Sequence, residues 1–246
     1  MKRTPWFRSW FGDDYLALYP HRDAEEARRA VELLSRAADV PPEGRVLDLA
    51  CGGGRHLAEL SRLGFQATGL DLSIPLLRAA QTAAPQASLV RGDMRALPFA
   101  PGSFDGVTSF FTSFGYFEEE YDDVRVLREV RRALANGGTF LLDFLNAGEV
   151  RANLKRGDHR TVEGVEVAQE RQLVDDGRIV EKRITIGPSD EQGERVFVER
   201  VRLYEPNELD EMLAAARLKP GRRFGSYDRS SFSPDSPRYI VMGRAF

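Results

Sequence analysis

The chain has 246 residues, of which 42% are hydrophobic and 30% are charged, and its formal net charge is −3. This composition is that of a globular protein and excludes a disordered chain, and no apolar run approaches the ~18 residues that a membrane-spanning helix needs. A single cysteine excludes a disulfide framework and a multi-cysteine zinc site, so we expect no metal.

The charges form no block of Lys or Arg long enough to resemble a nucleic-acid-binding arm. The first residues also lack the continuous apolar stretch of a signal peptide. We therefore expect a cytoplasmic protein, a monomer or a homodimer, that binds neither a membrane nor a nucleic acid.

Aromatic side chains dominate residues 5–20 and recur at roughly helical spacing. Two compatible interpretations are that this segment packs on the main domain and that it is a lid whose tyrosines, Tyr15 among them, close over a ligand. Residues 22–38 follow as an amphipathic helix with one apolar face. We assign residues 1–40 to an N-terminal helical or lid segment.

A short apolar strand at residues 46–49 runs into three consecutive glycines that end at Gly54. Such a strand, followed by glycines and a helix, brings backbone N–H groups close to a nucleotide-like ligand. The third glycine of a dinucleotide fingerprint is absent, and no Lys-Ser/Thr pair follows to make a phosphate loop. The carboxylate of Asp48, four residues before Gly52, would repel a pyrophosphate, so the loop favours a ligand that carries a positive charge.

Strands and helices alternate from this loop to residue 144. The predicted order is helix 55–63, strand 65–70, helix 73–83, strand 88–91, strand 104–111, a helix that includes residues 124–134, and strand 139–144. Asp71 follows the second strand, 19 residues after Gly52, near the ~20-residue offset at which a carboxylate meets ribose hydroxyls in nucleotide-binding βαβ units. This alternation predicts a parallel sheet with helices on both faces.

Period-2 patterns replace the helical ones between residues 160 and 203. Asp175-Asp176-Gly177 is a strong hairpin-turn signal between two of these stretches. We expect a three- or four-stranded antiparallel sheet inserted into the α/β domain. A helix at 208–216 and two strands at 222–226 and 238–244 then close the main sheet.

With these elements placed, the chain resembles the class I S-adenosylmethionine (SAM)-dependent methyltransferases over roughly residues 44–144. The motifs that carry the resemblance are the acidic-glycine run from Asp48 to Gly54, Asp71, Gly92-Asp93-Met94, Phe104-Asp105-Gly106-Val107 and the Gly137-Gly138 turn. The resemblance implies an α/β, Rossmann-like, doubly wound fold, whose seven-stranded and mostly parallel sheet has helices on both faces, plus an inserted antiparallel β-sheet. Residues 41–145 and 204–246 would be the SAM-binding domain, and residues 146–203 a subdomain that covers the acceptor site.

The resemblance also implies how SAM is held. Asp48 and the glycine backbone would hold its methionine part, Asp71 would accept from both ribose hydroxyls, and Asp93 would meet the adenine amino group. The expected cofactor-binding residues are Tyr15, Asp48, Ala50, Cys51, Gly52, Gly54, Asp71, Leu72, Gly92, Asp93, Met94 and Phe110. Cys51 is interpreted as a small packed residue and His56 as a surface or helix-capping residue.

The expected acceptor-binding residues are Phe111, Ser113, Tyr116, Arg200 and Tyr204. His159 is a further polar group that could line the acceptor pocket, and His159, Tyr116, Arg200 and Tyr204 could equally be structural. No catalytic residue is assigned, because methyl transfer from a sulfonium depends mainly on alignment and needs a base only if the acceptor must lose a proton.

The favoured hypothesis is a methyltransferase that acts by in-line displacement on an N or O atom of a small molecule, with S-adenosyl-L-homocysteine as the product of SAM. The first alternative is an RNA or protein methyltransferase. Methylation of a base amino group usually comes with an Asn/Asp-Pro-Pro-aromatic loop after the fourth strand, but residues 109–114 contain no proline. The second alternative is a nicotinamide-dependent reductase or a non-catalytic SAM-binding protein.

Overall fold

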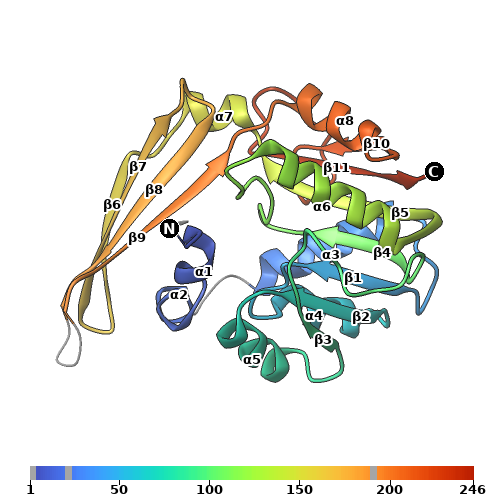
Figure 1. Ribbon diagram of the computed structural model, residues 1–246, viewed down its shortest axis with the longest axis horizontal. Coiled ribbons are helices and arrows are strands. Elements are labelled where there is room, and N and C mark those ends of the chain that lie inside the picture. Colours follow the sequence, from blue (N-terminus) through green and yellow to red (C-terminus); the bar gives the residue numbers. More distant parts are fainter. Residues whose placement is uncertain (1–3, 20–23, 189–192) are drawn as a thin grey trace.

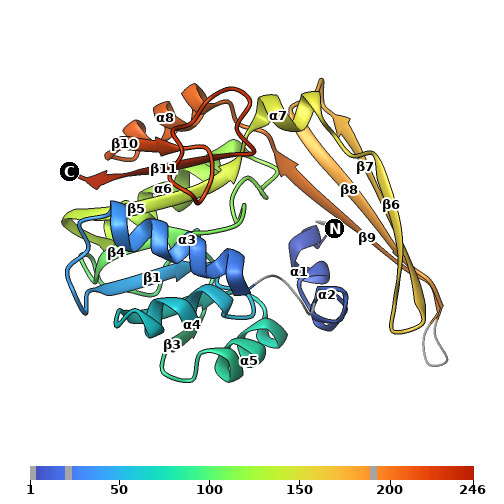
Figure 2. The same ribbon diagram turned by 180° about the vertical axis from the view of Figure 1, so that it is seen from behind.

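The computed structural model describes residues 4–19, 24–188 and 193–246, which form a large sheet flanked by helices and a smaller sheet beside it (Figures 1 and 2). The helices are α1 (Trp6–Trp10), α2 (Asp13–Leu18), α3 (Ala24–Ala37), α4 (Arg55–Arg62), α5 (Ile74–Ala83), α6 (Glu120–Ala133), α7 (Ala147–Ala152) and α8 (Pro206–Ala215). The strands of the large sheet are β1 (Arg45–Leu49), β2 (Gln66–Asp71), β3 (Ser88–Arg91), β4 (Phe104–Ser109), β5 (Leu134–Leu145), β10 (Leu218–Phe224) and β11 (Arg238–Ala245). The strands of the small sheet are β6 (Gly157–Val162), β7 (Val165–Val174), β8 (Ile179–Ile186) and β9 (Arg195–Arg202).

The large sheet has the strand order β10-β11-β5-β4-β1-β2-β3. Strands β1 to β5 pair in parallel, whereas β11 runs antiparallel to both β5 and β10. The predicted Rossmann-like fold with a seven-stranded, mostly parallel sheet and an inserted antiparallel sheet is therefore confirmed. The strand order reverses between β1 and β4, which is the position where open α/β sheets bind ligands.

Two hydrophobic clusters cover the two faces of this sheet. One joins the strands to α6 and α8, and the other joins them to α3 and α4. Successive residues of β5 divide between the clusters, since Phe140 and Leu142 lie in the first and Leu141 in the second. Burial on both faces explains the continuous apolar run Phe140-Leu141-Leu142 in β5.

The small sheet has the order β6-β7-β8-β9 and is antiparallel throughout. The predicted hairpin turn joins β7 to β8, with left-handed backbone at Asp175, Asp176 and Gly177. Helices α1 and α2 lie between the two sheets (Figure 1). The Trp10 ring is fully buried and packs against Phe197 at 4.7 Å between ring centroids, so the aromatic N-terminal segment docks on the inner face of the small sheet.

Some element boundaries differ from the predictions. The segment predicted as the turn Asn136-Gly137-Gly138 is an irregularity within β5, because Leu134 already pairs with Phe104 of β4. Strand β10 begins at Leu218, ahead of the predicted residue 222, although Pro220 and Gly221 favour a turn; this strand is at the sheet edge, where proline is tolerated. The predicted helix start at residues 22 and 23, the last residue of the aromatic segment (residue 20) and the first three residues of the predicted N-terminal segment lie outside the described residues.

Candidate active site

The glycine loop connects β1 to α4 with left-handed backbone at Ala50, Gly52 and Gly54. A Cβ atom added to Gly52 would meet nothing within 4 Å, so this glycine faces open space. Gly54 has a different reason to be glycine, because its Cβ would lie 2.8 Å from the Cα atom of Ala80 in α5. Gly52 thus leaves room for a ligand, and Gly54 allows two helices to approach.

A first cavity of about 520 Å³ lies over this loop and the carboxyl ends of β2 and β3, closed on the other side by α1 and α2. This volume is within the range of small-molecule sites. Thirteen of the residues predicted from the sequence line it: Tyr15, Ala50, Cys51, Gly52, Asp71, Leu72, Gly92, Asp93, Met94, Phe110, Phe111, Ser113 and Tyr116. The structure therefore brings together residues from five separate parts of the chain.

Asp48 lies behind the loop rather than in the wall of the first cavity. Its side chain is 1% exposed, Oδ1 accepts from Thr108 Oγ1 at 3.4 Å, and Oδ2 has no hydrogen-bond partner within the described residues. Burial raises the pKa of this carboxyl group to about 7. A buried carboxylate with one unsatisfied oxygen is the electrostatic complement of a cationic ligand group.

Asp71 ends β2 and is fixed by backbone donors. Gly52 N donates to Oδ2 at 2.9 Å and Ser73 N donates to Oδ1 at 2.8 Å. Burial raises the pKa of Asp71, and these hydrogen bonds oppose the shift. Each carboxylate oxygen has lone pairs left to accept from a ligand in the first cavity.

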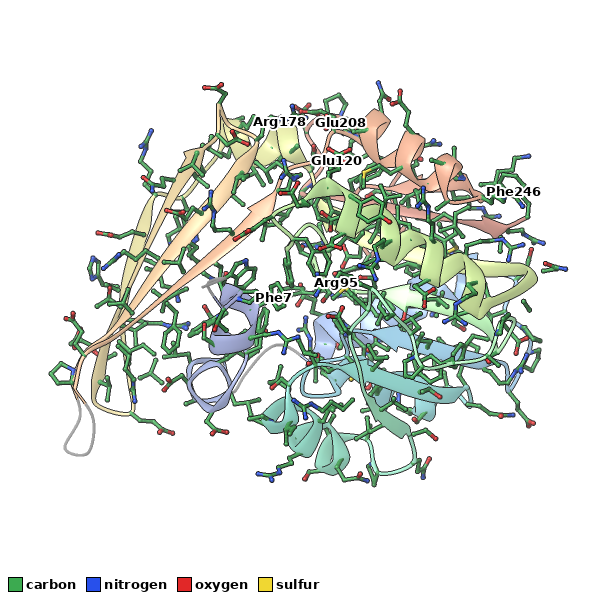
Figure 3. All side chains as sticks on the ribbon, viewed as in Figure 1. Phe7, Arg95, Glu120, Arg178, Glu208 and Phe246 are labelled. Atoms are coloured by element: carbon green, nitrogen blue, oxygen red, sulfur yellow. The ribbon has the colours of Figure 1, made fainter. Side chains whose placement is uncertain are left out.

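Asp93 follows β3 and forms a bidentate ion pair with Arg95, whose Nε and Nη2 atoms donate to it at 3.0 and 2.8 Å. Burial alone would raise the pKa of Asp93, but the bonds from Arg95 outweigh it and lower the pKa. The Arg95 guanidinium also covers the Phe117 ring, on which Phe7 of α1 packs edge-on. Phe7, which belongs to α1, and Arg95 both lie in the central part of the molecule (Figure 3).

The structure corrects the interpretation of His56. This residue is 5% exposed, lines the first cavity and stacks on Phe110 at 4.5 Å between ring centroids. It is buried because the first turn of α4 faces the end of β4, a contact that spacing along the chain does not reveal. Cys51 is buried in the cavity wall, and burial raises the pKa of its thiol, which makes it a poor nucleophile.

A second cavity of about 300 Å³ adjoins the first and shares four lining residues with it, Phe11, Tyr15, Phe111 and Tyr116. Its other walls come from the inner face of the small sheet, from α1, and from the ends of β5 and β11. The residues that line the second cavity but not the first are Trp6, Thr112, Leu145, Val150, Leu154, Arg171, Val180, Lys182, Glu199, Val201 and Arg238.

The backbone between the two cavities is held in an uncommon conformation. Phe111 and Thr112 both have left-handed backbone, with φ of 54° and 63°. Fully buried Asp143 of β5 stabilises this turn, because its Oδ2 accepts from Phe111 N at 2.7 Å and its carbonyl accepts from Thr112 N at 3.0 Å. Arg238 of β11 forms an ion pair with Asp143 and donates to Thr112 Oγ1 at 2.8 Å, and Tyr227 donates to the same carboxylate.

The structure places the remaining predicted acceptor residues outside both cavities. Tyr204 is buried in the core of the large sheet and donates to Asp123 at 2.9 Å. Arg200 pairs with Glu181, and His159 is exposed on β6. The alternation of β9 puts Arg200 on the face opposite to Glu199 and Val201, which line the second cavity.

The sequence reading did not single out Arg171, Lys182, Glu199 or Arg238. The first three are charged residues in a period-2 pattern, which is normally the signature of a solvated face. One signal was available. Lys182 lies two residues before Ile184 and Glu199 two residues after Phe197, so in each strand a charged residue shares a face with an inward-facing apolar residue.

Residues 46–138 match the family model of a methyltransferase domain. Among curated proteins, the dTDP-3-amino-3,4,6-trideoxy-alpha-D-glucopyranose N,N-dimethyltransferase of Streptomyces venezuelae is 30% identical over 157 residues, 61% of this chain and 66% of that protein. The chain spans about half the length of other curated relatives that it matches.

Two solved structures are similar over almost the whole chain. The CcbJ methyltransferase from Streptomyces caelestis has a TM-score of 0.79 at 22% identity, covering 96% of this chain and 98% of that one. The sugar N-methyltransferase KedS8 from Streptoalloteichus sp. ATCC 53650 has a TM-score of 0.71 at 25% identity, covering 95% of this chain and 93% of that one.

The fold, the glycine loop with its acidic partners and these matches identify a class I SAM-dependent methyltransferase domain, as the sequence predicts. Within the described residues, no cluster of three or more His, Cys, Asp or Glu side chains could hold a metal ion. In the same part of the chain, no helix combines the length and the apolar character that crossing a membrane requires.

Proposed function

We propose that this protein transfers a methyl group from SAM to an N or O atom of a small-molecule acceptor, leaving S-adenosyl-L-homocysteine. The observation that carries the proposal is the pair of adjoining cavities, which share Phe11, Tyr15, Phe111 and Tyr116. The names of the Streptomyces venezuelae dimethyltransferase and of KedS8 refer to small sugar acceptors, which supports an acceptor of this size. A cytoplasmic location and a monomeric or homodimeric state remain predictions.

The first cavity fits SAM. The unsatisfied oxygen of Asp48 complements the ammonium group of the methionine part, and the open space at Gly52 lets this part lie against the loop. Asp71 has acceptor capacity for the ribose hydroxyls, and Asp93 lies beside Met94 and Leu72 for the adenine. The backbone donors to Asp71 hold its carboxylate still, which lowers the entropic cost of binding.

The second cavity fits the acceptor. It is enclosed by α1, α2 and the inner face of the small sheet, so that residues 146–203 would cover the acceptor as predicted from the sequence. An acceptor packed against its aromatic and aliphatic side chains would displace water from the reacting atoms, which favours a reaction in which charge disperses. Tyr116 and Phe111 line both cavities and would lie where the methyl group and the acceptor atom meet.

When bound, SAM supplies a methyl group on a sulfonium, and the lone pair of the acceptor atom displaces the neutral thioether from that carbon. The task of the chain is to align the acceptor with the methyl group and to exclude water. The turn at Phe111 and Thr112, fixed by Asp143 and Arg238, holds the wall at which alignment occurs. We assign no general base.

The alternatives are weaker. An RNA or protein substrate would have to reach a second cavity that two helices and the small sheet enclose. The match to a methyltransferase domain disfavours a nicotinamide-dependent reductase.

The proposal is tested by calorimetry followed by a transfer assay. We expect SAM and S-adenosyl-L-homocysteine to bind with one site per chain and NADH not to bind. Incubation with methyl-labelled SAM and a panel of small amines and alcohols should then label at least one of them. Binding of NADH without SAM would contradict the proposal, as would label transferred only to tRNA or to protein.

A further inference from the structure

Three charged side chains form one rung across the small sheet where it borders the second cavity. Arg171 of β7 is directly opposite Lys182 of β8, and Lys182 is directly opposite Glu199 of β9. Directly opposite residues share a face, and all three line the second cavity. Apolar Val167, Ile184, Ile186 and Phe197 lie on the same face, packed under α1 and α2. The polar residues Gln169 and Arg195 also lie on it, directly opposite Ile184 and Ile186.

Two like charges face each other in this rung. Arg171 and Lys182 retain only 22% and 15% exposure of their side chains, so solvent screens their repulsion poorly. Like charges directly opposite on neighbouring strands destabilise a sheet. Each cation has one anionic partner, Asp158 for Arg171 and Glu199 for Lys182. The rung therefore gathers partly buried charges where the inner face borders the second cavity, which is where functional sites are expected.

The wall of the second cavity is rich in hydrogen-bond donors. It contains three cationic side chains, Arg171, Lys182 and Arg238, and one anionic side chain, Glu199. Both oxygens of Glu199 are already engaged, Oε1 by Trp10 Nε1 and Oε2 by Lys182 Nζ. Arg171 donates through Nη1 to Asp158 and through Nη2 to Gln169 Oε1, and a guanidinium has five N–H donors in all.

The remaining walls are apolar. Aromatic rings from α1 and from the region after β4 form one side, and aliphatic side chains form the rest. A ligand that suits both parts carries a compact group of oxygen acceptors at one end and an apolar ring or chain at the other. A carboxylate or a phosphate bound between a guanidinium and an ammonium makes charge-assisted hydrogen bonds.

We propose that Arg171 and Lys182 form a subsite for an anionic group, a carboxylate or a phosphate, of the methyl acceptor. The inference rests on the proposed function, since it takes the second cavity to be the acceptor site. The anion offsets the repulsion between the two cations, and the apolar part of the acceptor lies against the aromatic side next to the first cavity. The subsite thus selects anionic acceptors over neutral ones of the same shape.

The test measures binding to the full chain saturated with S-adenosyl-L-homocysteine. The probes are benzoate, phenyl phosphate and the neutral benzamide, each titrated by calorimetry. We expect at least one anion to bind tenfold or more tightly than benzamide, and the preferred anion distinguishes a carboxylate subsite from a phosphate subsite. Equal binding of all three probes, or binding of none of them, overturns the subsite.

Two variants with opposite expected effects keep the result independent of misfolding. Lys182→Met should weaken binding of the preferred anion about tenfold and leave benzamide unchanged. Glu199→Gln should strengthen anion binding, because it removes the anionic side chain of the wall while Gln can still accept from Trp10 Nε1. A loss of folding cannot strengthen binding. An unchanged or weaker anion affinity in a Glu199→Gln variant that still binds S-adenosyl-L-homocysteine as the unaltered protein does overturns the subsite.

Arg183→Met is the matched control, because Arg183 follows Lys182 on β8 and is exposed on the opposite face. It should change none of these affinities. If S-adenosyl-L-homocysteine itself does not bind, the proposed function fails. If it binds and the anions are not preferred, only the subsite fails.

Discussion

The two cavities are built in different ways. The first is made largely of backbone and of acids at the ends of consecutive parallel strands, such as Asp71 after β2 and Asp93 after β3. The second is made of side chains from segments far apart in the sequence, from Trp6 to Arg238. Under the proposed function, SAM would be bound by a part of the molecule whose geometry the strand order imposes, whereas the acceptor would be bound by a part that can change without altering the large sheet.

The two cavities also differ in the interactions that stabilise them. Asp71 is fixed by backbone N–H donors that the loop supplies in any case. The second cavity depends on ion pairs between strands and on the left-handed turn that Asp143 and Arg238 stabilise. Changes in the first cavity should therefore alter SAM binding, and changes in the second should alter acceptor binding and turnover while SAM binding stays constant.

The largest effect is expected from Gly52→Val. Position 52 has φ of 54°, which a β-branched residue rarely adopts, and its Cβ would project into the open space of the first cavity. SAM binding measured by calorimetry should be abolished. Gly64→Val is the control, because Gly64 is also left-handed with nothing within 4 Å of its Cβ but does not line the first cavity. Normal SAM binding by Gly52→Val would show that the loop is not at the cofactor.

Asp71→Ala should weaken SAM binding by roughly 1.5–3 kcal/mol, the contribution of a hydrogen bond to a charged group, which is about 10- to 150-fold in Kd. The loop also loses the acceptor for Gly52 N, so Asp71→Asn is measured beside it and should retain part of the affinity. Asp105→Ala, which removes a partly exposed acid paired with Arg45, should leave the Kd unchanged. An unaltered Kd in both Asp71 variants would mean that the ribose assignment is mistaken.

Arg238→Gln should affect the second cavity and the turn at Phe111, while the glycine loop and Asp71, which would hold SAM, stay in place. Breaking a buried ion pair costs about 3–5 kcal/mol of stability, and release of the turn should lower kcat about 10- to 100-fold through misalignment. The amide protons of Phe111 and Thr112 should exchange faster with solvent, because both donate to Asp143. The Kd of SAM should stay within twofold.

The control for this change is Arg244→Gln, on the same strand, whose ion pair with Asp39 is exposed. It should change neither the exchange rates nor kcat. If Arg238→Gln alters the Kd of SAM as much as Asp71→Ala does, the separation between the two cavities breaks down.

The smallest effect is a pH dependence of SAM binding. The carboxyl group of Asp48 has its pKa raised to about 7 by burial, and it must be ionised to meet an ammonium group. The Kd of SAM should therefore rise about tenfold from pH 8 to pH 6, since most of the carboxyl groups are protonated at the lower pH. Asp48→Asn should bind SAM weakly and without this dependence, and a flat profile in the unaltered protein would contradict the assignment.

The same group affects the stability of the protein without ligand, with the opposite dependence. Because the folded state binds this proton more tightly than the unfolded state, stability should fall as pH rises from about 4, the ordinary pKa of Asp, to about 7. Asp123, whose pKa burial also raises to about 7, contributes in the same direction, but it lies on α6, where it accepts from Tyr204 and from Gly115 N, and not behind the glycine loop. Asp123→Asn should therefore reduce the slope of the stability curve and leave the pH dependence of SAM binding unchanged.

The sequence by itself determined the parallel sheet, the inserted antiparallel sheet and the methyltransferase class. The two sheets follow from local quantities, the period of the apolar residues and the turn residues between the elements, and the class follows from the resemblance of the glycine loop and of the acids at the strand ends to the methyltransferase motifs. Asp71 is an example: its offset of 19 residues from Gly52 predicts a carboxylate at the end of the second strand, and the structure places it there, beside the glycine loop.

Only the tertiary structure decided which side chains line the second cavity. Arg200 and Lys182 are both long cationic side chains in the same period-2 pattern, so the sequence does not separate them. The face on which each lies depends on the register of β8 and β9 and on where α1 docks. His56 is buried for the same kind of reason, a contact with Phe110 across the molecule. Spacing along one chain predicts contacts within a βαβ unit, because the connection is short. A wall assembled from distant segments has no such constraint.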